Sequence, residues 1–117
     1  MLDIIAVLKI IAGVLTIATG LLSLIKPTEV YGFTGLRAEG GRGITEIRSI
    51  LGALFIALGA AVLFYRLPET YGMLGIMYLG IAVVLLVSMF IDHSIERSNI
   101  ISLVTEVVLG VILVLPG

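Results

Sequence analysis

The chain has 117 residues, of which 60% are hydrophobic and only 13% are charged. Soluble domains carry about 25% charged residues, and a domain this small buries the smallest share of its surface. The composition therefore excludes a soluble domain and predicts a single-domain integral membrane protein. The net charge of −1 without a basic run gives no sign of nucleic-acid binding. The lack of cysteine excludes disulfides and thiolate chemistry.

Four apolar segments are long enough, or nearly so, to cross a bilayer, which takes about 20 residues. The first covers about residues 2–25 and ends before Pro27. Its length, and Asp3 where a signal peptide has basic residues, favour a retained helix. The others cover about residues 45–65, 69–91 and 98–115, the last with Ser98 as a suitable N-cap.

A long polar loop over residues 26–44 and two short turns join the segments. Short connections place consecutive helices antiparallel. The sequence therefore predicts an all-α, up-down-up-down four-helix bundle with both termini on one side of the membrane.

The lysines and arginines set the expected orientation, because cytoplasmic loops carry an excess of them. More of them flank the loop side than the terminal side, so we expect residues 26–44 in the cytoplasm and both termini outside, in a prokaryotic inner or cell membrane. The loop-side cations are Lys26, Arg37, Arg42, Arg48 and Arg97, and the terminal-side cations are Lys9 and Arg66. Interfacial aromatic residues are expected at Phe64, Tyr65 and Tyr71 on one side and at Tyr31, Phe33 and Phe90 on the other.

Glycines recur seven residues apart on the first two segments, at Gly13 and Gly20 and at Gly52 and Gly59. Small residues let helices approach closely in lipid, so these faces are expected to meet neighbouring helices. Residues 11–22 and 50–61 also match at six of twelve positions. An inverted repeat of the transporter kind would explain the match, but the packing role of glycine explains it more simply.

Lys9, Arg48 and Glu106 each lie one helical turn before a glycine and share its face. An unpaired charge at mid-membrane costs about 2.5–3.5 kcal/mol on insertion scales. We therefore expect an intramembrane polar network in which Glu106 pairs with Lys9 or is reached by Arg48. Glu46 borders this network, near the headgroups. The network is either a proton- or substrate-binding site or a structural device that fixes helix pairing.

Asp92 and His93 belong to a polar turn between the last two segments. A solvated turn is favoured there over a metal site completed by Glu96. The glycine-rich stretch YGFTGLRAEGGRG is neither a dinucleotide fingerprint nor a P-loop. We expect no cofactor, no bound metal and no catalytic set.

The second segment reads EIRSILGALFIALG, and Asp92 and Glu106 follow fourteen residues apart. This pattern resembles an uncharacterised family of four-helix membrane proteins, domain of unknown function 4345, which is loosely similar to DoxX-like proteins. Its motif E-L-R-x-x-x-G-G corresponds to Glu46, Arg48 and Gly52, with Ala53 in place of the second glycine.

The resemblance covers most of residues 26–115 and departs from the family at two positions. A family arginine on the third helix is Leu85 here, and the glycine after the aspartate is His93. The resemblance implies a four-helix bundle in which Glu46, Arg48, Asp92 and Glu106 form a shared polar set. It implies no activity.

Two functions fit these features. The favoured one is a non-enzymatic bundle, either a structural or accessory subunit or a holder of a lipid or apolar ligand. The alternative is a small proton-coupled transporter acting as a homodimer, although small multidrug exporters carry their glutamate on the first helix, where this chain has Lys9. The expected partners are membrane lipids and either further copies of the chain or the subunits of a larger membrane complex.

Overall fold

The computed structural model describes residues 4–30 and 40–116, which contain helices and no strand. This confirms the all-α class for the described residues. The elements are α1 (Ile4–Ile25), the 3-10 helix η1 (Pro27–Val30), α3 (Gly40–Glu46), the π-helix η2 (Ile47–Leu54), α4 (Phe55–Tyr65), α5 (Pro68–Ile91) and α6 (Arg97–Val114). Elements α3, η2 and α4 form one continuous helical span, so that four described spans are long and apolar enough to cross a membrane.

The second span starts at Gly40, earlier than the predicted residue 45, and it contains eight π-helical residues. The glycines near its start favour a loop locally, but the helix of the apolar segment extends outward through them. A π-helix is rare, and a stretch of eight residues is too short to distinguish its period from that of an α-helix, which is why the sequence did not reveal it. α6 starts at Arg97 with Glu96 as its N-cap, so Ser98 is not the cap.

Two pairs of helices are joined by close glycine contacts. A Cβ atom added to Gly20 would lie 2.7 Å from the Gly52 carbonyl oxygen, and one added to Gly59 would lie 2.9 Å from that of Gly13. These contacts confirm that the glycine faces of the first two spans meet. A Cβ atom at Gly75 of α5 would lie 2.9 Å from the Gly110 oxygen of α6, which makes a similar seam in the second pair.

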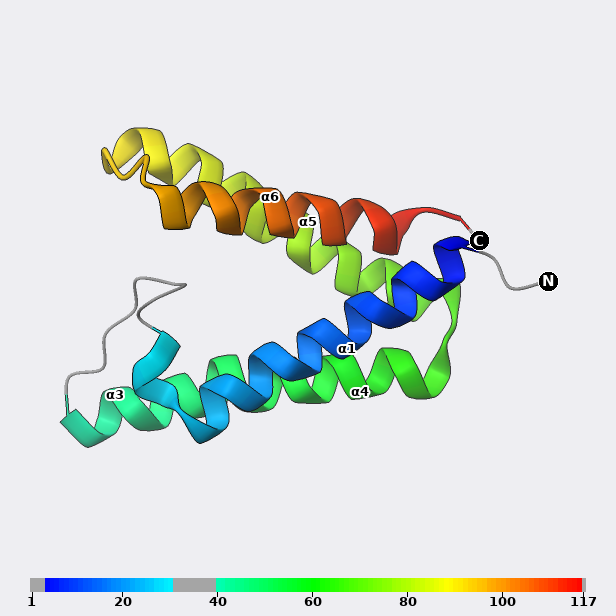
Figure 1. Cartoon of the computed structure of the whole chain (residues 1–117), viewed down its shortest axis with the longest axis horizontal. Coiled ribbons are helices and arrows are strands. Elements are labelled where there is room, and N and C mark those ends of the chain that lie inside the picture. Colours follow the sequence, from blue (N-terminus) through cyan, green and yellow to red (C-terminus); the bar gives the residue numbers. More distant parts are fainter. Residues whose placement is uncertain (1–3, 31–39, 117) are drawn as a thin grey trace.

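The molecule has two ends that differ in packing (Figure 1). At the terminal end lie the start of α1, the end of α6 and the turn between α4 and α5. At the loop end lie η1, α3 and the turn between α5 and α6, and here the two helix pairs diverge (Figure 1). The buried core lies toward the terminal end and consists of Ala12, Val62, Tyr71, Leu74, Tyr78 and Leu113.

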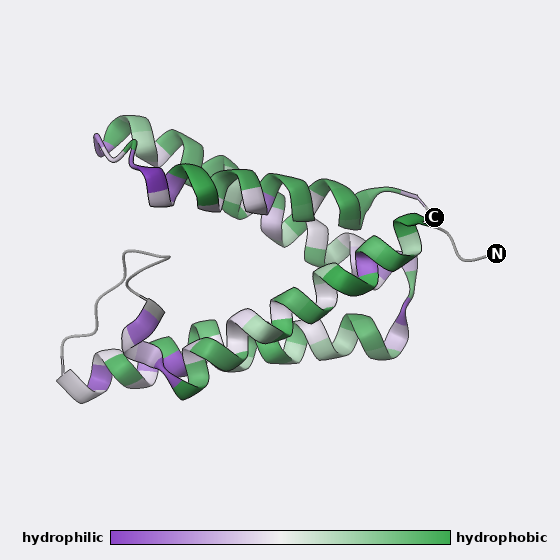
Figure 2. Cartoon of the chain, in the orientation of Figure 1, coloured by the Kyte–Doolittle hydropathy of each residue, from purple (hydrophilic) through white to green (hydrophobic). Residues whose placement is uncertain are grey.

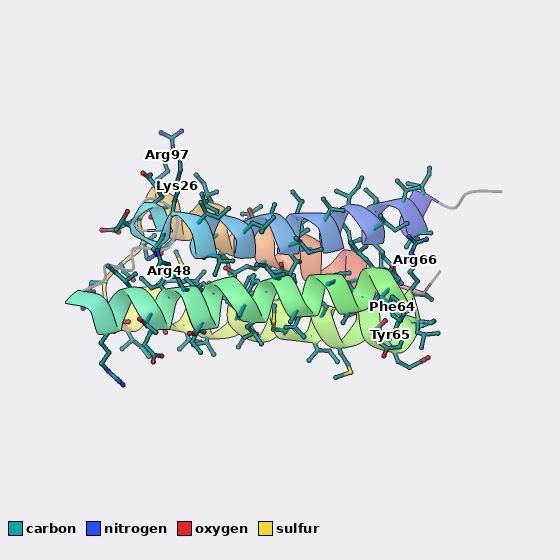
Figure 3. All side chains as sticks on the ribbon, turned by 90° about the horizontal axis from the view of Figure 1, so that it is seen from below. Lys26, Arg48, Phe64, Tyr65, Arg66 and Arg97 are labelled. Atoms are coloured by element: carbon teal, nitrogen blue, oxygen red, sulfur yellow. The ribbon has the colours of Figure 1, made fainter. Side chains whose placement is uncertain are left out.

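Polar residues gather near the two ends, whereas the helices between them are mostly apolar (Figure 2). Lys26, Arg48 and Arg97 lie at the loop end, and Phe64, Tyr65 and Arg66 lie at the terminal end (Figure 3). Phe64 and Tyr65 are exposed, as a residue at a membrane interface would be. Tyr71 lies in the first turn of α5, at the same end, but its side chain is buried in the core instead of being exposed. Tyr31 and Phe33 lie outside the described residues.

Candidate functional site

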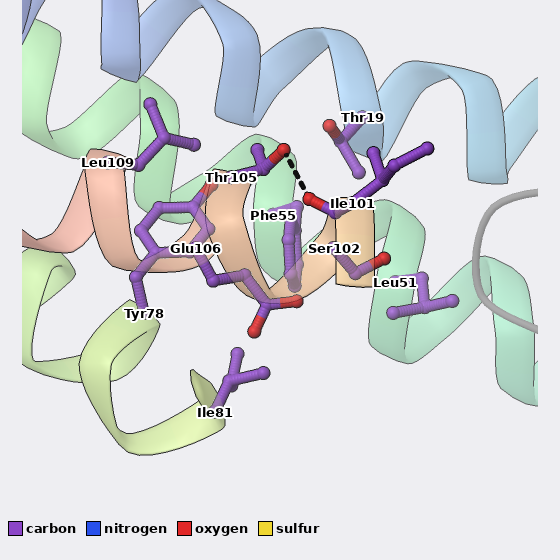
Figure 4. A pocket seen from close by; sticks show the side chains of 10 residues that line it. All are labelled: Thr19, Leu51, Phe55, Tyr78, Ile81, Ile101, Ser102, Thr105, Glu106 and Leu109. Carbon is purple, nitrogen blue, oxygen red and sulfur yellow. Dashed lines mark hydrogen bonds between the residues drawn. The ribbon is translucent and has the colours of Figure 1, made fainter. Parts of the chain in front are cut away.

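A cavity of about 340 Å³ lies between the two helix pairs, on the loop-end side of the core. All four spans contribute to it, because the pairs diverge at this level (Figure 1). Five of its lining residues are apolar and five carry a hydroxyl or carboxyl group (Figure 4). They are Thr19, Leu51, Phe55, Tyr78, Ile81, Ile101, Ser102, Thr105, Glu106 and Leu109.

Glu106 is the one acidic residue among those that line the cavity. Its Oε2 atom is buried and has no hydrogen-bond partner among the described residues. A buried polar atom without a partner costs about 1–3 kcal/mol, and more when it is charged. Because this unpartnered atom lies at a cavity, Glu106 is the leading candidate among the predicted site residues.

Tyr78 forms the floor of the cavity toward the core. It is 5% exposed, and its hydroxyl lies 2.6 Å from that of Thr16 on α1. The Thr16 hydroxyl donates to the Ala12 carbonyl at 2.8 Å, so the Tyr78 hydroxyl must donate to Thr16. The Phe55 ring meets the Tyr78 ring edge to face, with centroids 6.5 Å apart. Tyr78 is not among the residues predicted for the site, although its position in mid-span, far from the interfaces that tyrosine prefers, is a signal that the sequence contains.

Lys9 is buried at 1% exposure, as expected for a bundle-facing residue, but it does not meet Glu106. Its ammonium group donates to the carbonyl of Leu115, which ends α6, and lies 5.6 Å from the centre of the Tyr71 ring. Leu115 and Glu106 are nine residues apart on the chain, which is about 14 Å along a helix. The predicted pairing of Lys9 with Glu106 is therefore wrong, because the two groups lie at different levels of the bundle.

Arg48 does not reach the cavity either. It is exposed, and its Nε atom donates to the Leu24 carbonyl at 3.2 Å near the end of α1. Gly52, one turn later, lies against Leu24 as well, since a Cβ atom there would be 3.2 Å from the Leu24 Cβ. The arginine and glycine of the motif that starts at Glu46 thus dock the second span on α1. Glu46 itself is exposed.

Asp92 and His93 are exposed in the turn between α5 and α6, where His93 adopts a left-handed backbone with φ 51°. Asn99 closes this turn by donating to the Ser94 carbonyl at 2.8 Å. No group of three His, Cys, Asp or Glu side chains within residues 4–30 and 40–116 is arranged to hold a metal ion. Of the predicted site residues, the structure places Glu106 alone at the cavity.

No protein-family model, no curated protein and no solved structure matches the chain.

Proposed function

We propose that the protein is a small non-enzymatic integral membrane protein that holds a lipid or another apolar ligand between its two helix pairs. The cavity carries this proposal. Its volume of about 340 Å³ lies within the range of roughly 300–1,000 Å³ that is typical of small-molecule sites, and its lining combines apolar side chains with hydroxyl groups and one carboxyl group.

A binding role is favoured over catalysis by the chemistry of the lining. Hydrolysis or group transfer needs a nucleophile beside a base, or a metal. The single histidine of the chain, His93, lies in the exposed turn and is not among the lining residues. The hydroxyls of Thr19 and Thr105 donate to backbone carbonyls of their own helices, so neither is paired with a base in this structure.

In this proposal the four spans cross a prokaryotic inner or cell membrane alternately, as an up-down-up-down bundle. Support comes from the positions of the start of α1 and the end of α6 at one end of the molecule (Figure 1). Lys26, Arg48 and Arg97 gather at the opposite end (Figure 3), which the positive-inside rule assigns to the cytoplasm. Lipids cover the exposed apolar faces. Further copies of the chain, or the subunits of a larger complex, pack on α6, the least buried span.

One observation favours the alternative, a proton-coupled transporter acting as a homodimer. Glu106 places a carboxyl group in a cavity within a membrane span, and carboxyl groups in such positions carry protons in many pumps and transporters. The cavity would then bind substrate and proton in turn.

Native mass spectrometry of the protein gently extracted from its membrane tests the first proposal. We expect the wild type to retain a small molecule or lipid. Leu51→Trp, which fills the cavity, should lose that extra mass. Leu54→Trp is the matched control, because Leu54 is 45% exposed and does not line the cavity.

Equal retention by both variants would mean that the adduct lies outside the cavity and would contradict the proposal. A homodimer without any adduct would favour the transporter. Proton flux into vesicles that contain the wild type or Glu106→Gln would then be the next measurement.

A further inference from the structure

The cavity offers hydrogen-bond acceptors and few donors. A hydroxyl group has one proton to donate and two lone pairs that accept. Three of the hydroxyl groups that line the cavity already donate this proton in a hydrogen bond to another atom of the protein. Thr19 donates to Leu15 O at 3.0 Å, Thr105 to Ile101 O at 2.8 Å (Figure 4), and Tyr78 to Thr16 at 2.6 Å. Toward a ligand, these three hydroxyl groups can therefore act only as hydrogen-bond acceptors.

The carboxyl group of Glu106 adds to this excess of acceptors. Its buried Oε2 atom has no donor within the described part of the chain. Three cations that could have neutralised it are engaged elsewhere, Lys9 with Leu115 O, Arg48 with Leu24 O and Arg66 with Leu63 O. An ionised Glu106 therefore requires a donor, and preferably a positive charge, from beyond the described residues, which a bound ligand would supply.

Building on the proposed function, we propose that the ligand is a lipophilic amine whose protonated nitrogen binds Glu106. An alkylammonium group has donors and no acceptor, which complements this lining. The rings of Phe55 and Tyr78 beside the carboxyl group present aromatic surfaces that attract a cation. The hydrocarbon part of the ligand packs on Leu51 and Ile81.

The same features select against other amphiphiles. A fatty acid would bring a second carboxylate to Glu106 and find few donors. An aminophospholipid carries a suitable ammonium group next to a phosphate that also needs donors. Glu106 lies nine residues after Arg97, about 14 Å along α6 from its start, which is deep for a headgroup. A free amine therefore fits better than a phospholipid headgroup.

Competition binding on the full chain in phosphatidylcholine nanodiscs tests this proposal. Radiolabelled octylamine is the probe, empty nanodiscs give the background, and octanol and octanoate are competitors of equal chain length. We expect both competitors to be weaker than unlabelled octylamine by roughly tenfold or more, because charge-assisted hydrogen bonds are about twice as strong as neutral ones.

Variants of Glu106 locate the binding group. Glu106→Gln should weaken octylamine binding by roughly tenfold or more and remove the preference for amine over alcohol. Glu106→Asp keeps the charge and should keep the preference. Glu69→Gln is the matched control, since Glu69 is an exposed carboxylate at the start of α5, and it should bind as the wild type does.

Equal competition by octanol and octylamine on the wild type would overturn the inference even if Glu106→Gln failed to fold. The proposed ligand-holding function would still be supported if Leu51→Trp removed the native adduct, and it would be contradicted only if that variant had no effect on the adduct.

Nanodiscs that contain phosphatidylethanolamine distinguish the two possible sources of the ammonium group, a free amine and a lipid headgroup. Loss of octylamine binding in these nanodiscs would assign the site to a lipid headgroup and contradict the proposal of a free amine. Unchanged octylamine binding would support that proposal.

Discussion

At the scale of single residues, Lys9 shows how a backbone carbonyl and an aromatic ring can hold a buried cation in a helix bundle. Leu115 is the C-cap residue of α6 and has an extended backbone, so its carbonyl lies beyond the last helical turn and has no intrahelical donor. The ammonium group of Lys9 binds the Leu115 carbonyl at the end of α6 and lies over the electron-rich face of Tyr71. It therefore ties the first span to the last.

Lys9→Glu should destabilise the protein strongly, because it places a negative charge against a carbonyl and a ring face. We expect a loss of about 3 kcal/mol or more, as for other buried charges deprived of their partner. The midpoint of thermal unfolding in detergent, followed by circular dichroism, measures it. Lys26→Glu is the control, since Lys26 is exposed. Equal midpoints for the two variants would show that the Lys9 contacts contribute nothing.

At the scale of helices, the glycine seams determine which spans pair closely. A Cβ atom at Gly20 would meet backbone atoms of the second span, at 2.7 Å from Gly52 O and 2.8 Å from Ile56 N. Backbone cannot rotate away as a side chain can, so the helices would have to separate. Gly80 on α5 has nothing within 4 Å of such an atom.

Gly20→Ala should therefore lower stability by about 1–3 kcal/mol, the usual cost of overpacking. Gly80→Ala should leave stability unchanged or raise it slightly, because alanine is the better helix former. The two variants make the same chemical change in two membrane spans, and their melting midpoints in detergent can be compared directly. A Gly80→Ala midpoint below that of Gly20→Ala would contradict the assigned seams.

The sequence predicts much of this level of structure and little of the site. Hydropathy located the four spans, since each needs a long apolar run, and the spacing of Gly13, Gly20, Gly52 and Gly59 located the first seam. Residue spacing shows which face of a helix a charge occupies but not which level of the neighbouring helix it meets. For this reason Lys9 was paired with Glu106 instead of Leu115. The divergence of the helix pairs, which creates the cavity, depends on contacts between distant segments and left no local pattern.

At the scale of the whole molecule, the proposed orientation can be tested because the chain has no cysteine. Single cysteines at Glu69 and Asp92 would lie at opposite ends of α5, both exposed. With intact cells and a membrane-impermeant maleimide, Glu69→Cys should react at once and Asp92→Cys only after permeabilisation. The opposite pattern would invert the orientation, and reaction of both in intact cells would show that α5 does not cross the membrane.

Each glycine seam joins spans that follow one another along the chain, α1 with the second span and α5 with α6. Contacts between sequence neighbours form quickly because little chain entropy is lost in making them. During synthesis, the first pair can complete its seam before the residues after Pro68 have left the ribosome. We therefore expect folding to follow the order of translation and the cavity to form last, when the second pair docks on the first.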